Sequence, residues 1–124
     1  MKKIITSTKF PVSGPYSAAV EAHDFVFVSG QLPIDPATGE VIKDIRKAAR
    51  QALLNIKNIL NKTGMDMPDV VKTTLFLKDI KDFPAVNEIY SDFFPHDPPA
   101  RSTIEASVLP KECLLEIEAI AVRK

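Results

Sequence analysis

The segment between Asp44 and Gly64 constrains the fold most, because its pattern predicts one long amphipathic helix. Its apolar residues recur at helical spacing, whereas lysine, arginine and asparagine fill most of the other positions. Asp44 is a suitable N-cap and Gly64 a suitable C-terminal stop. The apolar positions are Ile45, Ala49, Ala52, Leu53, Ile56, Ile59 and Leu60. A helix with one apolar face needs a second layer that buries this face.

The second layer is predicted to be a β-sheet. Short runs rich in β-branched and apolar residues, bounded by turn residues, are typical of strands. Such runs occupy residues 3–6, 16–22, 25–29, 70–77, 101–108 and 115–122. A second helix is expected between Asp82, as its N-cap, and Pro95, which ends it. Its apolar face would carry Val86, Ile89, Tyr90 and Phe93.

About six strands and two helices in this order predict an α+β fold, with residues 1–124 forming a single domain. Two helices can cover only one face of such a sheet. The other face would carry polar groups but also apolar ones such as Ile120 and Val122. Because an open, half-apolar face is a liability, we expect a homo-oligomer with sites at or near the subunit contacts.

Composition excludes several classes of protein. Sixteen basic and sixteen acidic side chains give a net charge of zero, and no basic run calls for nucleic acid or a membrane surface. The single cysteine, Cys113, fits a reducing compartment. No signal peptide or membrane span is expected, so the sequence predicts a cytoplasmic protein. His23 and His96 lack metal-ligand spacing, and no metal site is predicted.

Arg101 and Glu116 are the candidate functional residues. Each lies on the polar side of an alternating strand pattern, and strands alternate their side chains with period two. The sequence therefore predicts that both project from one sheet surface. A guanidinium beside a carboxylate suggests a site for a small carboxylate-bearing molecule with an acid/base group next to it. The alternative is a structural cross-strand ion pair between the same residues.

Several short motifs in order resemble one known family. They are Gly14-Pro15-Tyr16-Ser17, Ser29-Gly30-Gln31, Asp35-Pro36-Ala37-Thr38-Gly39-Glu40, Val71-Lys72-Thr73-Thr74, Asn87, Pro99-Ala100-Arg101-Ser102 and Glu116-Ile117-Glu118-Ala119-Ile120-Ala121-Val122. Together they span almost the whole chain. On these motifs the chain resembles the RidA-type reactive intermediate deaminases, also called the YjgF-type family.

The resemblance implies a chorismate-mutase-like fold, in which two helices pack on one face of a mixed six-stranded sheet, and a homotrimer with clefts between subunits. It implies cofactor-independent hydrolysis of 2-imino and 2-enamino acids, such as 2-iminobutanoate and 2-iminopropanoate, to 2-keto acids and ammonia. Arg101 would bind the substrate carboxylate and Glu116 would position or activate water. The same cleft would be lined by Tyr16, Ser29, Gly30 and Asn87.

One departure from the family concerns Thr103, where the family often has cysteine. A cysteine nucleophile is therefore absent from this position, which favours direct attack by water, and the Thr103 or Tyr16 hydroxyl can donate a hydrogen bond to the transition state. Two other functions remain open. The cleft could bind keto acids or other small carboxylates without turnover. RNA cleavage, attributed to some members of the family, is disfavoured by the charge balance.

Overall fold

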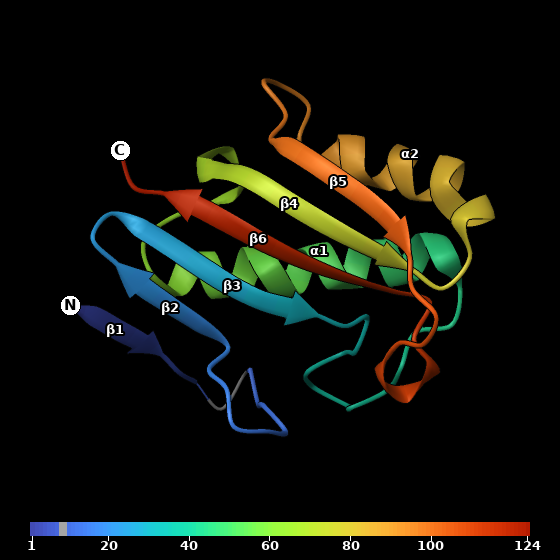
Figure 1. The fold of residues 1–124 in the computed structure, drawn as a ribbon, viewed down its shortest axis with the longest axis horizontal. Coiled ribbons are helices and arrows are strands. Elements are labelled where there is room, and N and C mark those ends of the chain that lie inside the picture. Colours follow the sequence, from blue (N-terminus) through green and yellow to red (C-terminus); the bar gives the residue numbers. More distant parts are fainter. Residues whose placement is uncertain (8–9) are drawn as a thin grey trace.

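The computed structural model describes residues 1–7 and 10–124. Within these residues six strands form one sheet, and two helices lie on one side of it (Figure 1). The strands are β1 (Lys2–Ile5), β2 (Ala19–Ala22), β3 (Phe25–Gln31), β4 (Val70–Leu77), β5 (Ala100–Glu105) and β6 (Leu115–Val122). The helices are α1 (Ile45–Lys62) and α2 (Phe83–Phe93), and the short 3-10 turns are η1 (Met67–Asp69), η2 (Ile80–Asp82) and η3 (Pro110–Glu112). The predicted α+β architecture is confirmed.

The sheet is mixed, with the strand order β1-β2-β3-β6-β4-β5. Every neighbouring pair is antiparallel except β4 and β5, which are parallel. Parallel neighbours require a crossover connection, and α2 lies in the connection between these two strands. After β4, the chain therefore passes through α2 and returns as β5, the edge strand next to β4.

The caps of α1 are as predicted, and Asp82 occupies the predicted N-cap position of α2 without a capping bond. A carboxylate oxygen of Asp44 accepts a hydrogen bond from the Lys47 backbone N–H at 3.0 Å, and Gly64 has a left-handed φ of +81° just after the helix. Asp82 makes no capping bond with its side chain. Instead Asp79 caps η2 by accepting from Lys81, and η2 leads directly into α2. Asp82 thus already has a helical backbone conformation, unlike the extended backbone of a typical N-cap residue.

Two strands are shorter than predicted. The run at residues 16–22 becomes a strand only at Ala19, because the residues before it turn away from β1. The run at residues 101–108 ends at Glu105. Its partner β4 ends at Leu77, whose carbonyl accepts one last hydrogen bond from Ala106. Beyond that point no strand remains to pair with.

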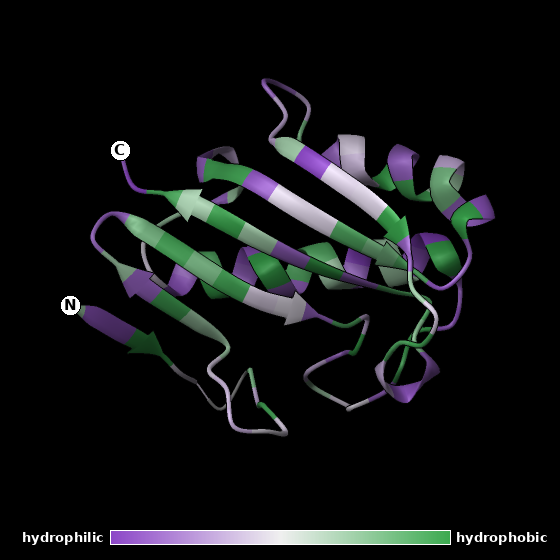
Figure 2. Cartoon of the chain, viewed as in Figure 1, coloured by the Kyte–Doolittle hydropathy of each residue, from purple (hydrophilic) through white to green (hydrophobic). Residues whose placement is uncertain are grey.

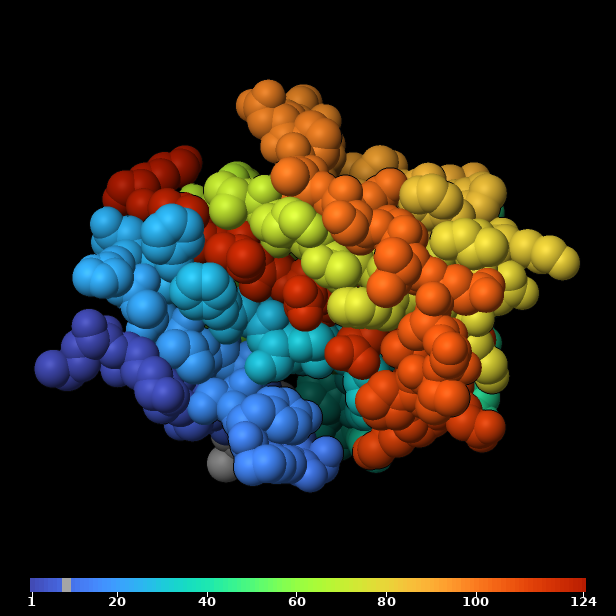
Figure 3. Space-filling view, viewed as in Figure 1, coloured from blue at the N-terminus to red at the C-terminus, as the bar shows by residue number. Residues whose placement is uncertain are grey.

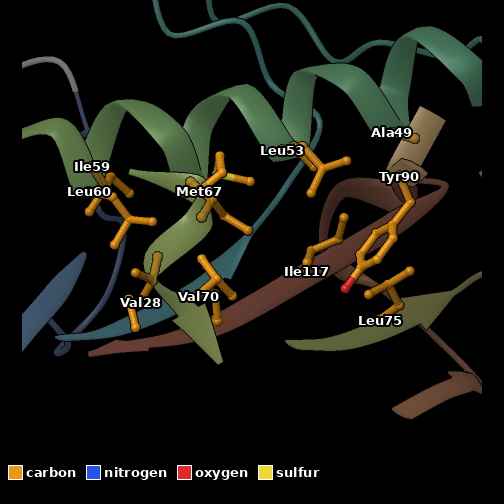
Figure 4. Packing of buried hydrophobic residues seen from close by; sticks show 14 of the residues in the cluster. Val28, Ala49, Leu53, Ile59, Leu60, Met67, Val70, Leu75, Tyr90 and Ile117 are labelled. Atoms are coloured by element: carbon orange, nitrogen blue, oxygen red, sulfur yellow. The ribbon is translucent and has the colours of Figure 1, made fainter. Parts of the chain in front are cut away.

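The hydrophobic core lies between the helices and one face of the sheet. Leu53 of α1, Leu75 of β4 and Ile117 of β6 are all fully buried there, and Figure 4 shows α1 covering these strands. The two helices are also tied to each other by ion pairs, Arg46–Glu88 at 2.8 Å and Arg50–Asp92 at 3.5 Å. Neither helix in the described part of the chain is both long enough and apolar enough to span a bilayer.

The opposite face of the sheet is uncovered and partly apolar, as expected. The strand registers align Ile4, Val20, Phe27 and Ile120 in one row across four strands. Phe27 remains 45% exposed, and its ring stacks on that of Phe25 at 6.1 Å. Figure 2 shows the apolar colouring along β3 and the C-terminal part of β6, the strands that carry Phe27 and Ile120. We call this surface the open face.

Candidate active site

Arg101 and Glu116 lie on opposite faces of the sheet, so the prediction of a shared surface is wrong. Arg101 is paired in register with Thr73, which is buried, and its guanidinium contacts α2. Glu116 alternates with Leu115 and Ile117, which are fully buried beneath the helices. Glu116 therefore projects from the open face.

The backbone separates these residues further. Strand β4 lies between β5 and β6, and Arg101 is level with Thr73 whereas Glu116 is level with Phe76. Two strand spacings and three residues of offset separate their backbones by about 14 Å. One small substrate cannot contact both residues of the same chain, and they form no cross-strand ion pair. The polar side of β5 faces the helices because this edge strand is only partly covered by α2.

The first group of site residues, which we call the arginine half, comprises Arg101, Thr103 and Asn87. The Cζ atom of Arg101 lies 5.1 Å from the ring centroid of Phe83 and 4.7 Å from that of Tyr90. None of the ion pairs among the described residues involves Arg101. The guanidinium is therefore half-buried without a counter-ion.

Thr103 and Asn87 also have unused hydrogen-bonding capacity. The Oγ1 atom of Thr103 and the Oδ1 atom of Asn87 are buried without a hydrogen-bond partner. Thr103 follows Arg101 on the same side of β5, and Asn87 lies between Phe83 and Tyr90 on one face of α2. Because a buried polar atom without a partner is costly, this half has the chemistry of a site that a polar ligand completes.

The second group, the glutamate half, comprises Tyr16, Ser29, Gly30 and Glu116. A Cβ atom at Gly30 would overlap the carboxylate of Glu116, so only glycine allows this close approach. Burial raises the pKa of Glu116, and the negative charge of Glu118 adds to this shift. A carboxyl with a raised pKa is a better proton acceptor than an ordinary one.

Ser29 positions the backbone next to Tyr16. Its hydroxyl donates a 2.6 Å hydrogen bond to the Ser17 carbonyl, and its N–H donates to the Ala18 carbonyl at 2.9 Å. Tyr16 is 53% exposed and lines, with Gly30 and Lys111, a groove of about 940 Å³. Figure 3 shows this hollow between the blue N-terminal segment and the orange-red loop. Every predicted site residue thus belongs to one of the two halves, but the two halves are separated within the chain.

Phe83 and Tyr90 were missed as functional candidates. The helical pattern marks Tyr90 as a core residue, and nothing local links either ring to an arginine on another element. The only sequence signal is the spacing of Phe83, Asn87 and Tyr90, which puts three side chains on one helix face before the strand that carries Arg101.

Comparisons with known proteins agree with the motif resemblance. A model of the family described as endoribonuclease L-PSP matches residues 6–123. A RutC family protein of Pyrococcus horikoshii is 48% identical over 126 residues, which cover 100% of both chains. A protein of Salmonella typhimurium named 2-iminobutanoate/2-iminopropanoate deaminase is 46% identical over 128 residues, again covering 100% of both chains.

A solved structure extends the likeness to the fold. The crystal structure of E. coli TdcF with bound serine is 43% identical to this chain and superposes with a TM-score of 0.92. The match covers 98% of this chain and 99% of that chain.

Proposed function

This chain belongs to the endoribonuclease L-PSP family, and on that premise we propose that it is a 2-iminobutanoate/2-iminopropanoate deaminase. The reaction would be hydrolysis of 2-imino and 2-enamino acids to 2-keto acids and ammonia. The observation that carries this proposal is the unpaired guanidinium of Arg101, flanked by two aromatic rings and by unpartnered polar atoms. The name of the Salmonella relative supplies the substrate class.

The complete site is proposed to form between two copies of the chain. Because the arginine half and the glutamate half lie on opposite faces, a neighbouring copy must supply one of them. The open face gives a reason for such contacts, since a neighbouring copy would bury the exposed Phe27 and the apolar residues aligned with it. Glu116 projects from that same face, so covering it brings a second chain to the carboxylate. A closed ring of three copies, the assembly implied by the family resemblance, would repeat this contact three times.

In the proposed mechanism Arg101 binds both oxygens of the substrate carboxylate, which fixes the adjacent C2 atom. Glu116 of the neighbouring copy accepts a proton from water while the water oxygen bonds to C2. The electron pair of the C=N bond moves to nitrogen, which takes the proton from Glu116 and gives a carbinolamine. Glu116 then transfers the proton of the carbinolamine hydroxyl to nitrogen, so that the C–N bond breaks and ammonia leaves as the C=O bond forms. The Tyr16 and Thr103 hydroxyls would support the polar intermediate by hydrogen bonding.

The decisive experiment generates 2-aminoacrylate or 2-iminobutanoate with a dehydratase and follows keto-acid release. We expect the protein to accelerate release over the spontaneous rate. Arg101→Ala should abolish the acceleration, and Glu116→Gln should lower it by at least a hundredfold, roughly the contribution of a general base. Glu118→Gln, which changes an exposed carboxylate on the same strand and face, is the matched control and should lose far less activity than Glu116→Gln, because burial rather than Glu118 is the main cause of the raised Glu116 pKa. Unchanged keto-acid release with the wild-type protein would refute the proposal.

The same variants test the alternatives. A non-catalytic binding protein would hold 2-ketobutanoate through Arg101, show no turnover, and be indifferent to Glu116→Gln. RNA cleavage, which the family description names, finds no support in a net charge of zero. We expect no RNA binding at physiological salt and propose no nucleic-acid partner.

A further inference from the structure

The guanidinium of Arg101 contacts two rings that come from a single helix. Phe83 and Tyr90 are seven residues apart on α2, close to two full turns, so their side chains lie on the same face of the helix. The Cζ atom of Arg101 lies over both rings, 5.1 Å from the centroid of Phe83 and 4.7 Å from that of Tyr90. One guanidinium therefore contacts both rings at once.

The ring of Tyr90 is itself held in place from several sides. Its hydroxyl shares a 2.7 Å hydrogen bond with the hydroxyl of Thr73, which is only 1% exposed and lies directly opposite Arg101 in the sheet register. The ring packs against Phe94 with a centroid distance of 4.7 Å. Figure 4 shows Tyr90 reaching from α2 down to β4, with its oxygen toward the strands. The ring cannot swing away without breaking a buried hydrogen bond.

We propose that Phe83 and Tyr90 are positioning residues that cover the flat faces of the Arg101 guanidinium and leave only its N–H edge free for the substrate carboxylate. The inference rests on the proposed function, in which Arg101 binds that carboxylate. All the N–H donors of a guanidinium lie in its plane, and a two-pronged carboxylate bond lies in the same plane. Fixing the plane of Arg101 thus fixes the direction from which C2 is presented to the attacking water.

This arrangement also explains how the cation is tolerated. A half-buried charge without a counter-ion is unfavourable, and stacking on aromatic rings offsets part of that cost. A lysine at this position would present a compact ammonium with no plane to be held. The rings therefore favour arginine specifically, rather than any cation.

The test is calorimetric binding of 2-ketobutanoate, the keto-acid product, alongside the coupled deaminase assay. Phe83→Leu should weaken keto-acid binding roughly tenfold and raise KM by a similar factor, the scale of a partly desolvated cation–π contact. Phe83→Tyr, which retains the ring, should restore wild-type binding. Phe93→Leu is the matched control, because it makes the same change on the same helix without contact to Arg101.

The same Phe83→Leu substitution in an Arg101→Lys background distinguishes the positioning of Arg101 from general damage to the fold. In Arg101→Lys protein, Phe83→Leu should cause a clearly smaller loss of binding, because a lysine ammonium can still contact the ring but has no plane to be held. Tyr90→Phe keeps the ring but removes the bond to Thr73 that holds it, so it should lower the thermal midpoint and weaken keto-acid binding less than Phe83→Leu does.

The outcomes are distinct. Wild-type affinity in Phe83→Leu, or an equal loss in both the Arg101 and Arg101→Lys backgrounds, would overturn the positioning role. Keto-acid binding that depends on Phe83 without any deaminase activity would uphold the positioning role and refute the proposed function. If the wild-type protein binds no keto acid, Arg101 is not a carboxylate anchor and the inference fails with it.

Discussion

Gly30 and Glu116 approach so closely that a Cβ atom on the glycine would occupy the space of the carboxylate. Glycine is not required at position 30 for its backbone angle, because only Gly39 and Gly64 among the four glycines have left-handed φ values. It is required because any side chain at position 30 would overlap Glu116. The approach fixes where Glu116 can place its oxygens.

Gly30→Ala should displace this carboxylate and lower kcat by about a hundredfold, the scale expected when a catalytic group moves by about 1 Å. Binding of 2-ketobutanoate should change little, because the arginine half is untouched. Steady-state kinetics with calorimetry would check both. Adding Glu116→Gln to Gly30→Ala should cause little further loss, since both changes act on the same group. An additive loss would contradict this account.

Mixing two inactive variants should restore activity if the site forms between copies. Arg101→Ala chains retain the glutamate half, and Glu116→Gln chains retain the arginine half. After co-refolding, some interfaces would pair two intact halves. We expect activity to appear only in the mixture, to about a quarter or less of the wild-type level, given that mixing is random and each interface needs both halves. No recovery, with mixed assemblies demonstrated by mass spectrometry, would place both halves of a working site in one chain.

Phe27→Asp should break the assembly. It inserts a charge into the apolar row of the open face, and a charge is costly to bury without a partner. Light scattering should show a smaller particle, and the deaminase activity should fall with it. Ile80→Asp is the control, because Ile80 is similarly exposed, at 43% against 45% for Phe27, but lies outside the sheet. An intact assembly in Phe27→Asp would mean that the open face is not the contact surface.

The raised pKa of Glu116 predicts a pH dependence of stability with a definite sign. Burial favours the protonated form, so the folded-state pKa lies above the usual value of 4.5. The stability that protonated Glu116 contributes is fully present below pH 4.5 and is lost as the pH rises through the folded-state pKa. The thermal midpoint of Glu116→Gln, measured relative to that of wild type, should therefore rise as the pH increases from acidic to neutral. A difference that is constant across this range would contradict the raised pKa.

Much of the fold was predictable because its signals are local. The α1 helix has an apolar stripe, a capping aspartate and a terminal glycine, each readable within one turn or two. The strands β4 and β6 likewise appear where β-branched residues cluster. Asp82 directly precedes α2 as predicted, but the sequence did not predict the 3-10 turn η2 that Asp79 caps just before it.

The site was harder to predict because its geometry is non-local. Alternation within one strand separates two faces but does not tell which face of β5 continues which face of β6. That relation depends on β4 lying between them and on α2 leaving part of the edge uncovered. Polarity suggested that Arg101 and Glu116 share a surface, and the register of β4 with its two neighbours shows that they do not.

The crossover from β4 to β5 has one more consequence. The aromatic rings, the amide of Asn87 and Arg101 all come from a single uninterrupted stretch of chain, residues 83–103, whereas the glutamate half is gathered from distant segments. In the proposed mechanism, substrate binding therefore depends on one short continuous segment, which could be exchanged between relatives without altering the residues assigned to bond cleavage.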